Sequence, residues 1–288
     1  MKLLVNLTKK ELDNYLEFTN SFIIGLKDFC VNYYGITILE IKEILDKYDI
    51  ELFVAINKNI FNGDLDLLKE NLIELNKLKI KGILFYDLSV LNLVKSLNLN
   101  IDLCIHQTHM VTNYNICNYY LKKKVKYAYL ATEITKDEIE EISLQSDINL
   151  MTYFIGHVIV SHSKRGLLSN YYEYFKKDKV NNLNIIKEKN KDTKYYVLEN
   201  EIGTNILTYD ILNGTRAFVD LKDKISYGIL DSNLIDDFIF LQILSLYKLN
   251  LDNKISNQEL IKKVEELIGS YEGFFFKKTI YKVVHEKS

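Results

Sequence analysis

Residues 126–157, KYAYLATEITKDEIEEISLQSDINLMTYFIGH, contain a strand, a helix and a second strand in succession. Two short runs, 126–131 and 149–155, have the length and the β-branched or aromatic content of buried strands. Between them, Thr135 is followed three residues later by Glu138, which is a capping box at the start of a helix. Strands joined through a helix run parallel, so this stretch predicts one β/α unit of a parallel sheet.

The same alternation of strand-length runs and helix-period segments extends back to the N-terminus. Further strand-like runs occupy residues 3–7, 22–26, 51–56, 82–86 and 101–105. Seven or eight units of about 20 to 25 residues suit a closed, TIM-like (β/α)8 barrel. The alternative is an open, doubly wound sheet, but no GxGxxG turn follows the first strand, as the dinucleotide-binding form of that fold would require. We therefore predict the α/β barrel.

The pattern changes after the seventh predicted strand. Residues 1–175 hold the first seven β/α units. Residues 176–226 begin with a segment rich in lysine and asparagine and continue with two strand-like runs, which predicts a small antiparallel β insertion. Residues 227–288 hold the last β/α unit, a C-terminal helix over 257–268 and an aromatic terminal strand over 274–284.

Composition excludes several classes of protein. The chain has 288 residues, of which 48% are hydrophobic and 26% charged, so it is not a disordered chain. The net charge of −2 gives no global basic field, although a local lysine patch is invisible in that sum. No apolar run has the length of a signal-peptide core or a membrane span, so we expect no membrane association. Three cysteines without CxxC spacing fit a reducing compartment, which predicts a cytoplasmic protein.

Polar residues gather just after the predicted fifth, sixth and seventh strands. Because TIM-type barrels place their chemistry at the carboxyl ends of the strands, these residues are candidates for binding or catalysis. They are His106, His109, Glu133, His157, His162 and Ser163. The alternative is that they are ordinary polar residues of exposed loops. We expect no metal site, because these histidines and the glutamate follow different strands and lack the helical spacing of a ligand pair.

Arginine occurs at only two positions, Arg165 and Arg216, among 37 lysine and arginine residues. A chain that otherwise uses lysine is expected to keep arginine where a planar, bidentate donor is needed, and its natural partners are carboxylates or phosphates. Arg165 also follows a strand and enters a helix whose free amides attract anions. We therefore predict both arginines as anion-binding residues, with a structural ion pair as the alternative for Arg216.

Other nucleophiles and ring-rich segments give weaker signals. Ser163, His162 and Asp231 lack the GxSxG elbow that positions the serine of many hydrolases. The cysteines are expected to be buried small hydrophobic residues. Paired tyrosines such as Tyr171 and Tyr172 could stack on nucleic-acid bases while lysines contact the phosphates. On barrel helices, however, such pairs are more often packing residues.

Several segments, in the same order along the chain, resemble the peptidase U32 family, whose members are often called collagenase-like proteases. They are HQTHMVTN (106–113), LATEIT (130–135), YFIGH (153–157), SKRGLLSNY (163–171), GTNI (203–206) and DIL (210–212). Each segment alone is short, whereas their order spans most of the chain. By these segments and their order, the chain resembles a member of the peptidase U32 family.

The departures from the family pattern refine this resemblance. Iron–sulfur members place cysteines where this chain has Ile159, Gly166 and Leu212, and such clusters need thiolate ligands. The family's arginine before the glutamate is Thr132 here, while Glu133 is kept. The combination resembles a cysteine-poor group encoded beside a longer, cluster-bearing paralogue and implicated in making 5-hydroxyuridine at the tRNA wobble position. The resemblance thus implies no cofactor in this chain and a four-iron four-sulfur cluster only in its partner.

Three functions remain open. The resemblance implies a subunit for tRNA wobble-uridine 5-hydroxylation in a hetero-oligomer with the cluster-bearing paralogue, with strand-end residues holding a small carboxylate or phosphate and lysines meeting tRNA phosphates. The first alternative is a U32-type, collagenase-like protease, for which the chain offers no HExxH motif and no paired catalytic aspartates. The second is a non-catalytic scaffold subunit that binds and stabilises the paralogue.

Overall fold

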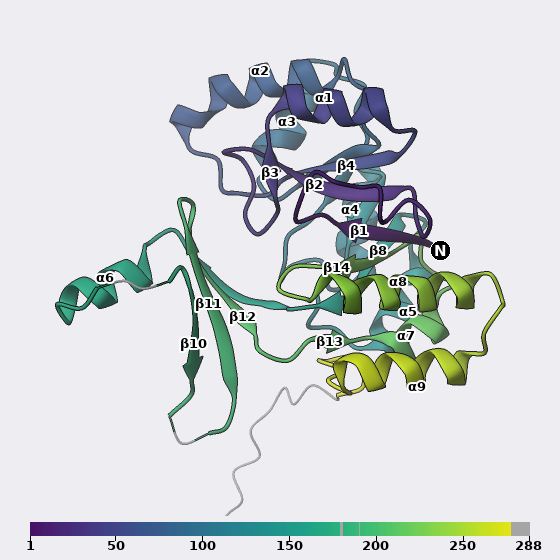
Figure 1. Ribbon diagram of the computed structural model, residues 1–288. Coiled ribbons are helices and arrows are strands. Elements are labelled where there is room, and N and C mark those ends of the chain that lie inside the picture. Colours follow the sequence, from purple (N-terminus) through teal and green to yellow (C-terminus); the bar gives the residue numbers. More distant parts are fainter. Residues whose placement is uncertain (179–180, 190, 278–288) are drawn as a thin grey trace, which may run out of the picture.

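The computed structural model describes residues 1–178, 181–189 and 191–277, and at its centre is a closed barrel of parallel strands (Figure 1). In order around the barrel the strands are β1 (Lys2–Asn6), β2 (Ser21–Leu26), β4 (Glu51–Ile56), β5 (Gly82–Phe85), β6 (Leu103–Ile105), β7 (Tyr127–Tyr129), β8 (Asn149–Gly156) and β14 (Tyr227–Asp231). β1 pairs in parallel with both β2 and β14, which closes the barrel. The predicted TIM-like (β/α)8 fold is confirmed.

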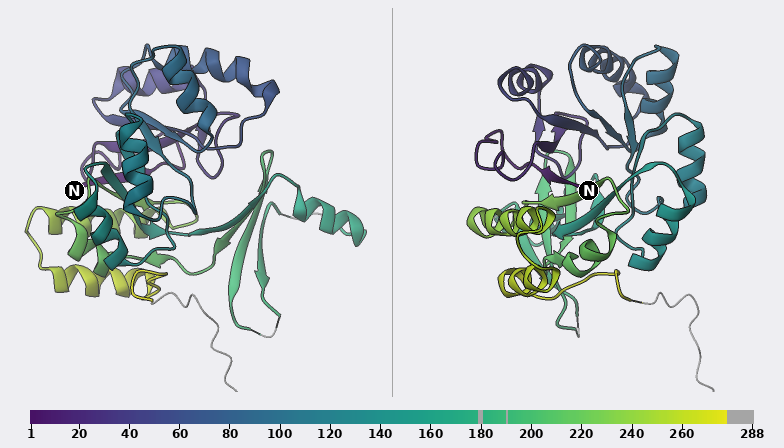
Figure 2. Two further views of the ribbon diagram at one scale, coloured as in Figure 1. Left: turned by 180° about the vertical axis from the view of Figure 1, so that it is seen from behind. Right: turned by 90° about the vertical axis from the view of Figure 1, so that its right-hand side faces the viewer.

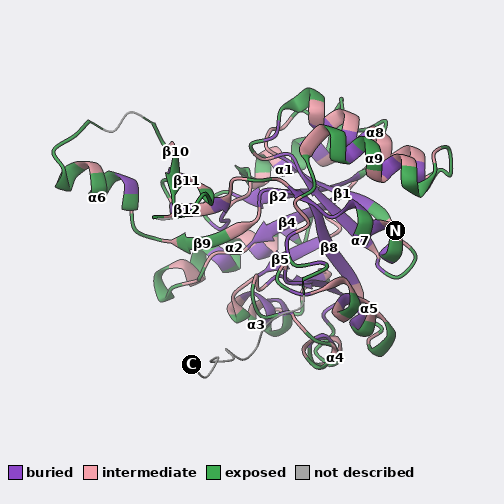
Figure 3. Cartoon of the chain, turned by 90° about the horizontal axis from the view of Figure 1, so that it is seen from below, coloured by how far each residue is buried: buried purple, intermediate pink, exposed green. Residues whose placement is uncertain are grey.

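Helices surround the barrel (Figure 2). They are α1 (Ile38–Lys47), α2 (Leu65–Leu75), α3 (Leu88–Ser96), α4 (Tyr114–Lys122), α5 (Lys136–Gln145), α7 (Thr215–Leu221), α8 (Asp237–Leu251) and α9 (Asn257–Ile268). Short elements β3 (Gly35–Ile36), η1 (Asn62–Asp64) and β13 (Leu212–Asn213) lie in the connections. Because helices cover the strands from outside, the barrel strands form the buried centre of the molecule (Figure 3). Among the described helices, none has the length and apolar content needed to cross a membrane.

Local sequence explains where α5 begins. Thr135 caps its first turn, and the carboxylate of Glu138 accepts a hydrogen bond from the Thr135 amide at 2.7 Å, which forms the predicted capping box. Ile139 and Ile142 then face the barrel and are buried. A capping box of the same kind starts α1. Helix starts of this kind depend on residues within one turn, so the sequence pattern is sufficient to locate them.

The chain leaves the barrel after β8 and builds a second sheet before it returns. β9 (Ile159–Ser163), β10 (Leu183–Lys187), β11 (Lys194–Asn200) and β12 (Gly203–Thr208) form an antiparallel sheet in the order β10-β11-β12-β9. α6 (Leu167–Tyr174) follows β9. This sheet and α6 project from the barrel on the side where β8 ends (Figure 1). The antiparallel insertion expected after the seventh strand is present.

The residues of the insertion differ from the expected limits, 176–226. β9 already belongs to the antiparallel sheet although it precedes residue 176, and α7 packs on β8 as a barrel helix although it lies before residue 226. β9 is largely exposed, so no apolar alternation marks it in the sequence. At the C-terminus, residues 274–276 of the expected terminal strand form a turn, and residues 278–284 lie outside the described residues.

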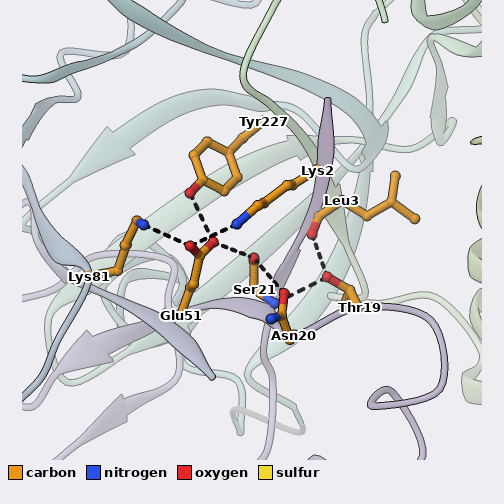
Figure 4. A network of polar contacts seen from close by, with 8 residues as sticks. All are labelled: Lys2, Leu3, Thr19, Asn20, Ser21, Glu51, Lys81 and Tyr227. Carbon is orange, nitrogen blue, oxygen red and sulfur yellow. Dashed lines mark hydrogen bonds and ion pairs between the residues drawn. The ribbon is translucent and has the colours of Figure 1, made fainter. Parts of the chain in front are cut away.

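The amino ends of the barrel strands meet around the carboxylate of Glu51 (Figure 4). Its Oε1 accepts hydrogen bonds from Nζ of Lys2 at 2.8 Å and of Lys81 at 2.7 Å. Its Oε2 accepts from the hydroxyls of Ser21 and Tyr227, each at 2.9 Å. Burial alone would raise the pKa of Glu51, but these four donors outweigh it and lower the pKa to about 2. A stabilising network of this kind is typical of the amino face of a TIM-type barrel, whose chemistry lies at the opposite face.

Candidate functional site at the barrel mouth

A small pocket opens at the carboxyl end of the barrel, between the ends of β6, β7, β8 and β14. Its polar and aromatic lining consists mainly of Tyr33, His106, Tyr129, Tyr153, His157 and Asp231. Ile159 of β9 and Leu207 of β12 line it from the side of the insertion. The cavity volume is about 40 Å³, room for about three ordered waters or a group of similar size. The insertion therefore narrows the mouth at the face where this fold places chemistry.

His106 follows β6 and lies inside the pocket. Its ring stacks on Tyr129 with centroids 4.1 Å apart, and the edge of Tyr33 meets it at 5.9 Å. The Nδ1 atom of His106 is 3.5 Å from the hydroxyl oxygen of Tyr33. Burial lowers the pKa of His106 to about 4, so the imidazole is neutral near pH 7. A neutral imidazole offers a ligand one donor and one acceptor.

Asp231 ends β14 and brings a buried carboxyl group to the same pocket. The hydroxyl of Tyr153 donates to its Oδ2 at 3.2 Å, and the amide of Asn233 donates to its Oδ1 at 2.9 Å. Burial raises the pKa of Asp231, and hydrogen bonds from Asn233, Asn6 and Tyr153 oppose the rise only in part. Burial also raises the pKa of Tyr153, which keeps its hydroxyl protonated. The pocket thus presents a carboxyl group, phenol hydroxyls and a neutral imidazole to a small polar ligand.

His157 lies directly after β8 and joins the insertion to the pocket rim. It is buried, its Nδ1 is 2.9 Å from the carbonyl oxygen of Thr208, and its ring meets Tyr196 at 5.2 Å. Burial lowers the pKa of His157, while the carbonyl group of Thr208 acts in the opposite direction. These contacts tie the exit of β8 to the end of β12, so His157 serves as an anchor as well as a lining residue.

A second, more open cavity of about 230 Å³ adjoins the pocket beside β9 and shares His106 with it. Its further lysines and histidines are His109, His162, Lys164 and Lys58, and Lys58 also pairs with the carboxylate of Asp64 at 3.2 Å. Nδ1 of His109 is 3.1 Å from the carboxylate of Glu133, and both side chains are half-exposed. Nδ1 of His162 is 2.6 Å from Oδ1 of Asn205. His109 and His162 therefore belong to this outer cavity, and Glu133 reaches it through its contact with His109.

Ser163 and Arg165 lie at the corner between β9 and α6. The Ser163 hydroxyl accepts a hydrogen bond from the Arg165 amide at 3.2 Å, and among the described residues no imidazole or carboxylate partners it as a base. The Arg165 side chain is exposed. The first amides of α6 are not free for a ligand, because the buried carboxylate of Glu199 accepts from the amides of Leu168 at 2.8 Å and Ser169 at 3.2 Å. The anion at this helix start is an internal glutamate.

Arg216 lies apart from the mouth, in the first turn of α7. Its Nη1 pairs with the carboxylate of Glu272 at 3.1 Å, and its guanidinium lies 4.8 Å from the ring centroid of Phe276. Both partners belong to the segment after α9. The structural ion pair that was the alternative for Arg216 is therefore present, and the two arginines do not form one site.

Sequence reasoning missed the aromatic lining of the pocket. Tyr129 and Tyr153 lie on β7 and β8, Asp231 is the last residue of β14, and Tyr33 lies in the connection between β2 and β3. Position along the strand could have identified Tyr129, Tyr153 and Asp231. Side chains near the carboxyl end of a barrel strand can point into the mouth as readily as those of the loop that follows. Tyr33 belongs to the tyrosine pair Tyr33–Tyr34, a pattern that favours a packing role over a site.

The three cysteines do not fit an iron–sulfur cluster. Cys30, Cys104 and Cys117 are buried, unpaired and on separate parts of the fold. Burial raises the pKa of Cys30 to about 12 and that of Cys117 to about 11, whereas cluster ligands are thiolates. Ile159, Gly166 and Leu212 occupy the positions where the family resemblance implies cysteines. Within the described ranges, no group of three or more His, Cys, Asp or Glu side chains is placed to hold a metal ion.

Comparison with known proteins assigns the chain to a protein family. The family model "Peptidase family U32" matches residues 23–280. The chain belongs to peptidase family U32. The resemblance seen in the strand-end segments is thus confirmed over most of the chain.

Two curated relatives come from Bacillus subtilis (strain 168). The tRNA hydroxylation protein P2 is 28% identical over 262 residues, which cover 83% of this chain and 84% of the relative. The tRNA hydroxylation protein P1 is 23% identical over 147 residues, which cover 51% of this chain and 35% of the relative. Among solved structures, the U32 peptidase Mk0906 has a TM-score of 0.49 and 11% identity, with 80% of this chain and 92% of that chain covered.

Proposed function

We propose that this U32 protein is a subunit of a system that hydroxylates carbon 5 of the wobble uridine of tRNA. The observation that carries the proposal is its similarity to the tRNA hydroxylation protein P2, which extends over most of both chains. The mouth pocket supports a binding role, because it combines buried polar groups with aromatic walls. A small carboxylate is the kind of ligand that its protonated hydroxyls would hold through hydrogen bonds.

The proposed partner is a cluster-bearing U32 paralogue. Hydroxylation of a ring carbon is a two-electron oxidation that needs an oxidant, for which a cluster in the partner would carry the electrons. The cysteines of this chain do not fit an iron–sulfur cluster. The relation to both P1 and P2 of one organism supports a pair of unlike U32 chains. We assign the four-iron four-sulfur cluster to the partner and ligand or tRNA binding to this chain.

Within this chain, the proposal gives the two cavities different tasks. In the inner pocket, His106, Tyr153 and Asp231 orient a small polar ligand through hydrogen bonds. The outer cavity, with Lys58, Lys164 and its two histidines, faces the nucleic acid. Arg165 lies next to this cavity in the chain and remains a candidate for a phosphate contact.

The first test is deletion of the gene in its own host, followed by mass spectrometry of tRNA nucleosides. We expect 5-hydroxyuridine to disappear while unrelated modifications such as pseudouridine stay constant, and the wild-type gene to restore it. Restoration should fall at least about tenfold with Asp231→Asn or Arg165→Ala, as expected for loss of a buried or charged contact. Arg216→Ala is the matched control, because that arginine is paired away from the mouth.

Three outcomes separate the alternatives. An unchanged level of 5-hydroxyuridine after deletion would contradict the proposal. Full restoration by Arg165→Ala and Asp231→Asn, with the complex intact, would favour the scaffold subunit. For the protease, Ser163 has no base beside it among the described residues, and only hydrolysis of collagen or casein that is lost with Ser163→Ala would revive that hypothesis.

A further inference from the structure

α6 carries aromatic side chains that the core does not cover. Tyr171, Tyr174 and Phe175 are 52%, 81% and 51% exposed, whereas Leu168 is the buried residue of this helix. The ring centroids of Tyr171 and Phe175 are 4.8 Å apart, and those of Tyr174 and Phe175 are 5.0 Å apart. α6 lies at the outer end of the projecting insertion, away from the barrel (Figures 1 and 2). A cluster of exposed rings on the surface of a folded chain marks an interaction site.

Unpaired cations flank these rings. Residues 164–178 contain four lysines and arginines and two acidic residues. Arg165 before the helix, and Lys176 and Lys177 after it, form no ion pair with any described residue. The whole insertion, residues 157–214, has nine lysines and arginines against seven acidic residues, although the chain carries a net charge of −2. The insertion is therefore a locally positive part of a negative protein, which suits a polyanion.

The corner between β9 and α6 connects these rings to the mouth. Nζ of Lys164 lies 3.4 Å from the ring centroid of Phe61, the residue before η1, so the corner rests against the barrel rim. Lys164 and His162 also line the outer cavity, which shares His106 with the inner pocket. A row of cationic and polar groups thus runs from the start of α6 to the mouth pocket.

We infer that residues 162–177, the arm tip, bind a single-stranded segment of RNA and lead it toward the barrel mouth. Bases stack on Tyr171, Tyr174 and Phe175, and phosphates meet Arg165 and the two lysines after α6. Exposed rings interleaved with cations are the pattern of a single-strand binding surface, whereas lysines are depleted from the centres of protein interfaces. The inference rests on the proposed function only for the identity of the RNA as tRNA.

The test measures binding of a fluorescein-labelled RNA hairpin with a uridine-containing loop to the full chain by fluorescence anisotropy. For the triple variant Tyr171→Ala, Tyr174→Ala and Phe175→Ala we expect Kd to rise about tenfold or more, because stacking on several rings is lost. The matched control is Tyr119→Ala with Phe238→Ala, two exposed rings on other helices. All these rings are exposed, so the variants should keep the wild-type melting temperature, which is measured in parallel.

A second variant tests the phosphate contacts. For Lys176→Ala with Lys177→Ala, the slope of log K against log salt should fall by about one or two, one for each phosphate contact removed. Lys262→Ala with Lys263→Ala on α9 removes the same charge elsewhere and should leave the slope unchanged.

Several results would overturn the inference. They are no measurable binding of the hairpin by the wild-type chain, equal affinity of the arm-tip and control variants, or loss of paralogue binding with RNA affinity intact, which would make the arm tip a protein interface. The proposed function fails separately: if deletion leaves 5-hydroxyuridine unchanged while the arm-tip variants lose RNA affinity, the arm tip binds another RNA.

Discussion

At the scale of single residues, the mouth pocket is defined by burial more than by charge. His106 is held neutral, and Asp231 has a raised pKa, because both side chains are enclosed by aromatic rings and neighbouring strands. The charged side chains around the mouth lie further out, as does Glu133, which contacts His109 where both groups are half-exposed. The pocket therefore suits hydrogen bonding to a desolvated ligand, and the outer cavity suits electrostatic attraction.

His106 makes the stability of the protein depend on pH. In the unfolded chain it takes up a proton near pH 6.5, but in the folded protein only near pH 4. Between these values the unfolded state binds more protons, so stability falls as pH decreases from 6.5 to 4. Urea unfolding should show that His106→Gln removes about 2 kcal/mol of the loss between pH 7 and pH 5.

The control for this prediction is His109→Gln, which changes a half-exposed histidine on the same loop. It should leave the dependence on pH close to that of the wild type. If both variants lose stability on acidification as the wild type does, burial of His106 is not the cause.

At the scale of elements, α6 is held in place by side chains from other strands, and Glu199 makes most of these contacts at its first turn. Glu199 of β11 accepts hydrogen bonds from the first amides of α6 and, at 3.1 Å, from the hydroxyl of Thr204 on β12. With eight residues and one buried side chain, α6 has little packing of its own to keep it folded. Its order therefore depends on a buried carboxylate that caps it from outside the helix.

We expect Glu199→Ala to unfold α6 locally without unfolding the barrel. Removing the cap should lower the protection of the α6 amides against hydrogen exchange by about tenfold or more, which corresponds to loss of hydrogen bonds to a charged group. The melting temperature of the barrel should stay close to the wild-type value. Glu201→Ala, an exposed glutamate in the same hairpin, is the control and should leave protection unchanged.

At the scale of the whole molecule, closure of the barrel depends on contacts between its first and last strands. β1 and β14 pair along their whole length, from Lys2 with Tyr227 to Asn6 with Asp231. At the amino face, Glu51 binds groups from the first strand and the last strand at once (Figure 4). This carboxylate therefore stabilises the closed form rather than any single β/α unit.

Glu51→Gln should lower the free energy of unfolding by about 2 to 4 kcal/mol, because two lysines lose the charge that pairs them in a partly buried position. The folded pKa of about 2 is below the unfolded value of 4.5, so the contribution is present above pH 4.5 and is lost as pH falls toward 2. Denaturant unfolding at pH 7 and pH 3 checks both points. Glu74→Gln, whose pair with Lys77 is exposed, should change stability by less than about 0.5 kcal/mol.

Much of the barrel was predictable because its signals are local. Seven strand-length runs, the capping box at Thr135 and the helix over 257–268 each depend on residues within a few positions of one another. The order of those elements, with helices between strands, then requires parallel pairing. The strand-end histidines were placed at the mouth by the same reasoning.

The sequence by itself thus determined the barrel, the family and the loops around the mouth. Only the tertiary structure decided the site, because its contacts join residues that are distant in the chain. Tyr153 meets Asp231 across 78 positions, and Glu199 occupies the start of α6 across 31. It also separated two arginines that composition had grouped, since Arg216 finds Glu272 only after α9 has folded back. Local sequence patterns indicate which side chains face the core. The partners and the charge state of each group depend instead on the distant parts of the chain that pack against it.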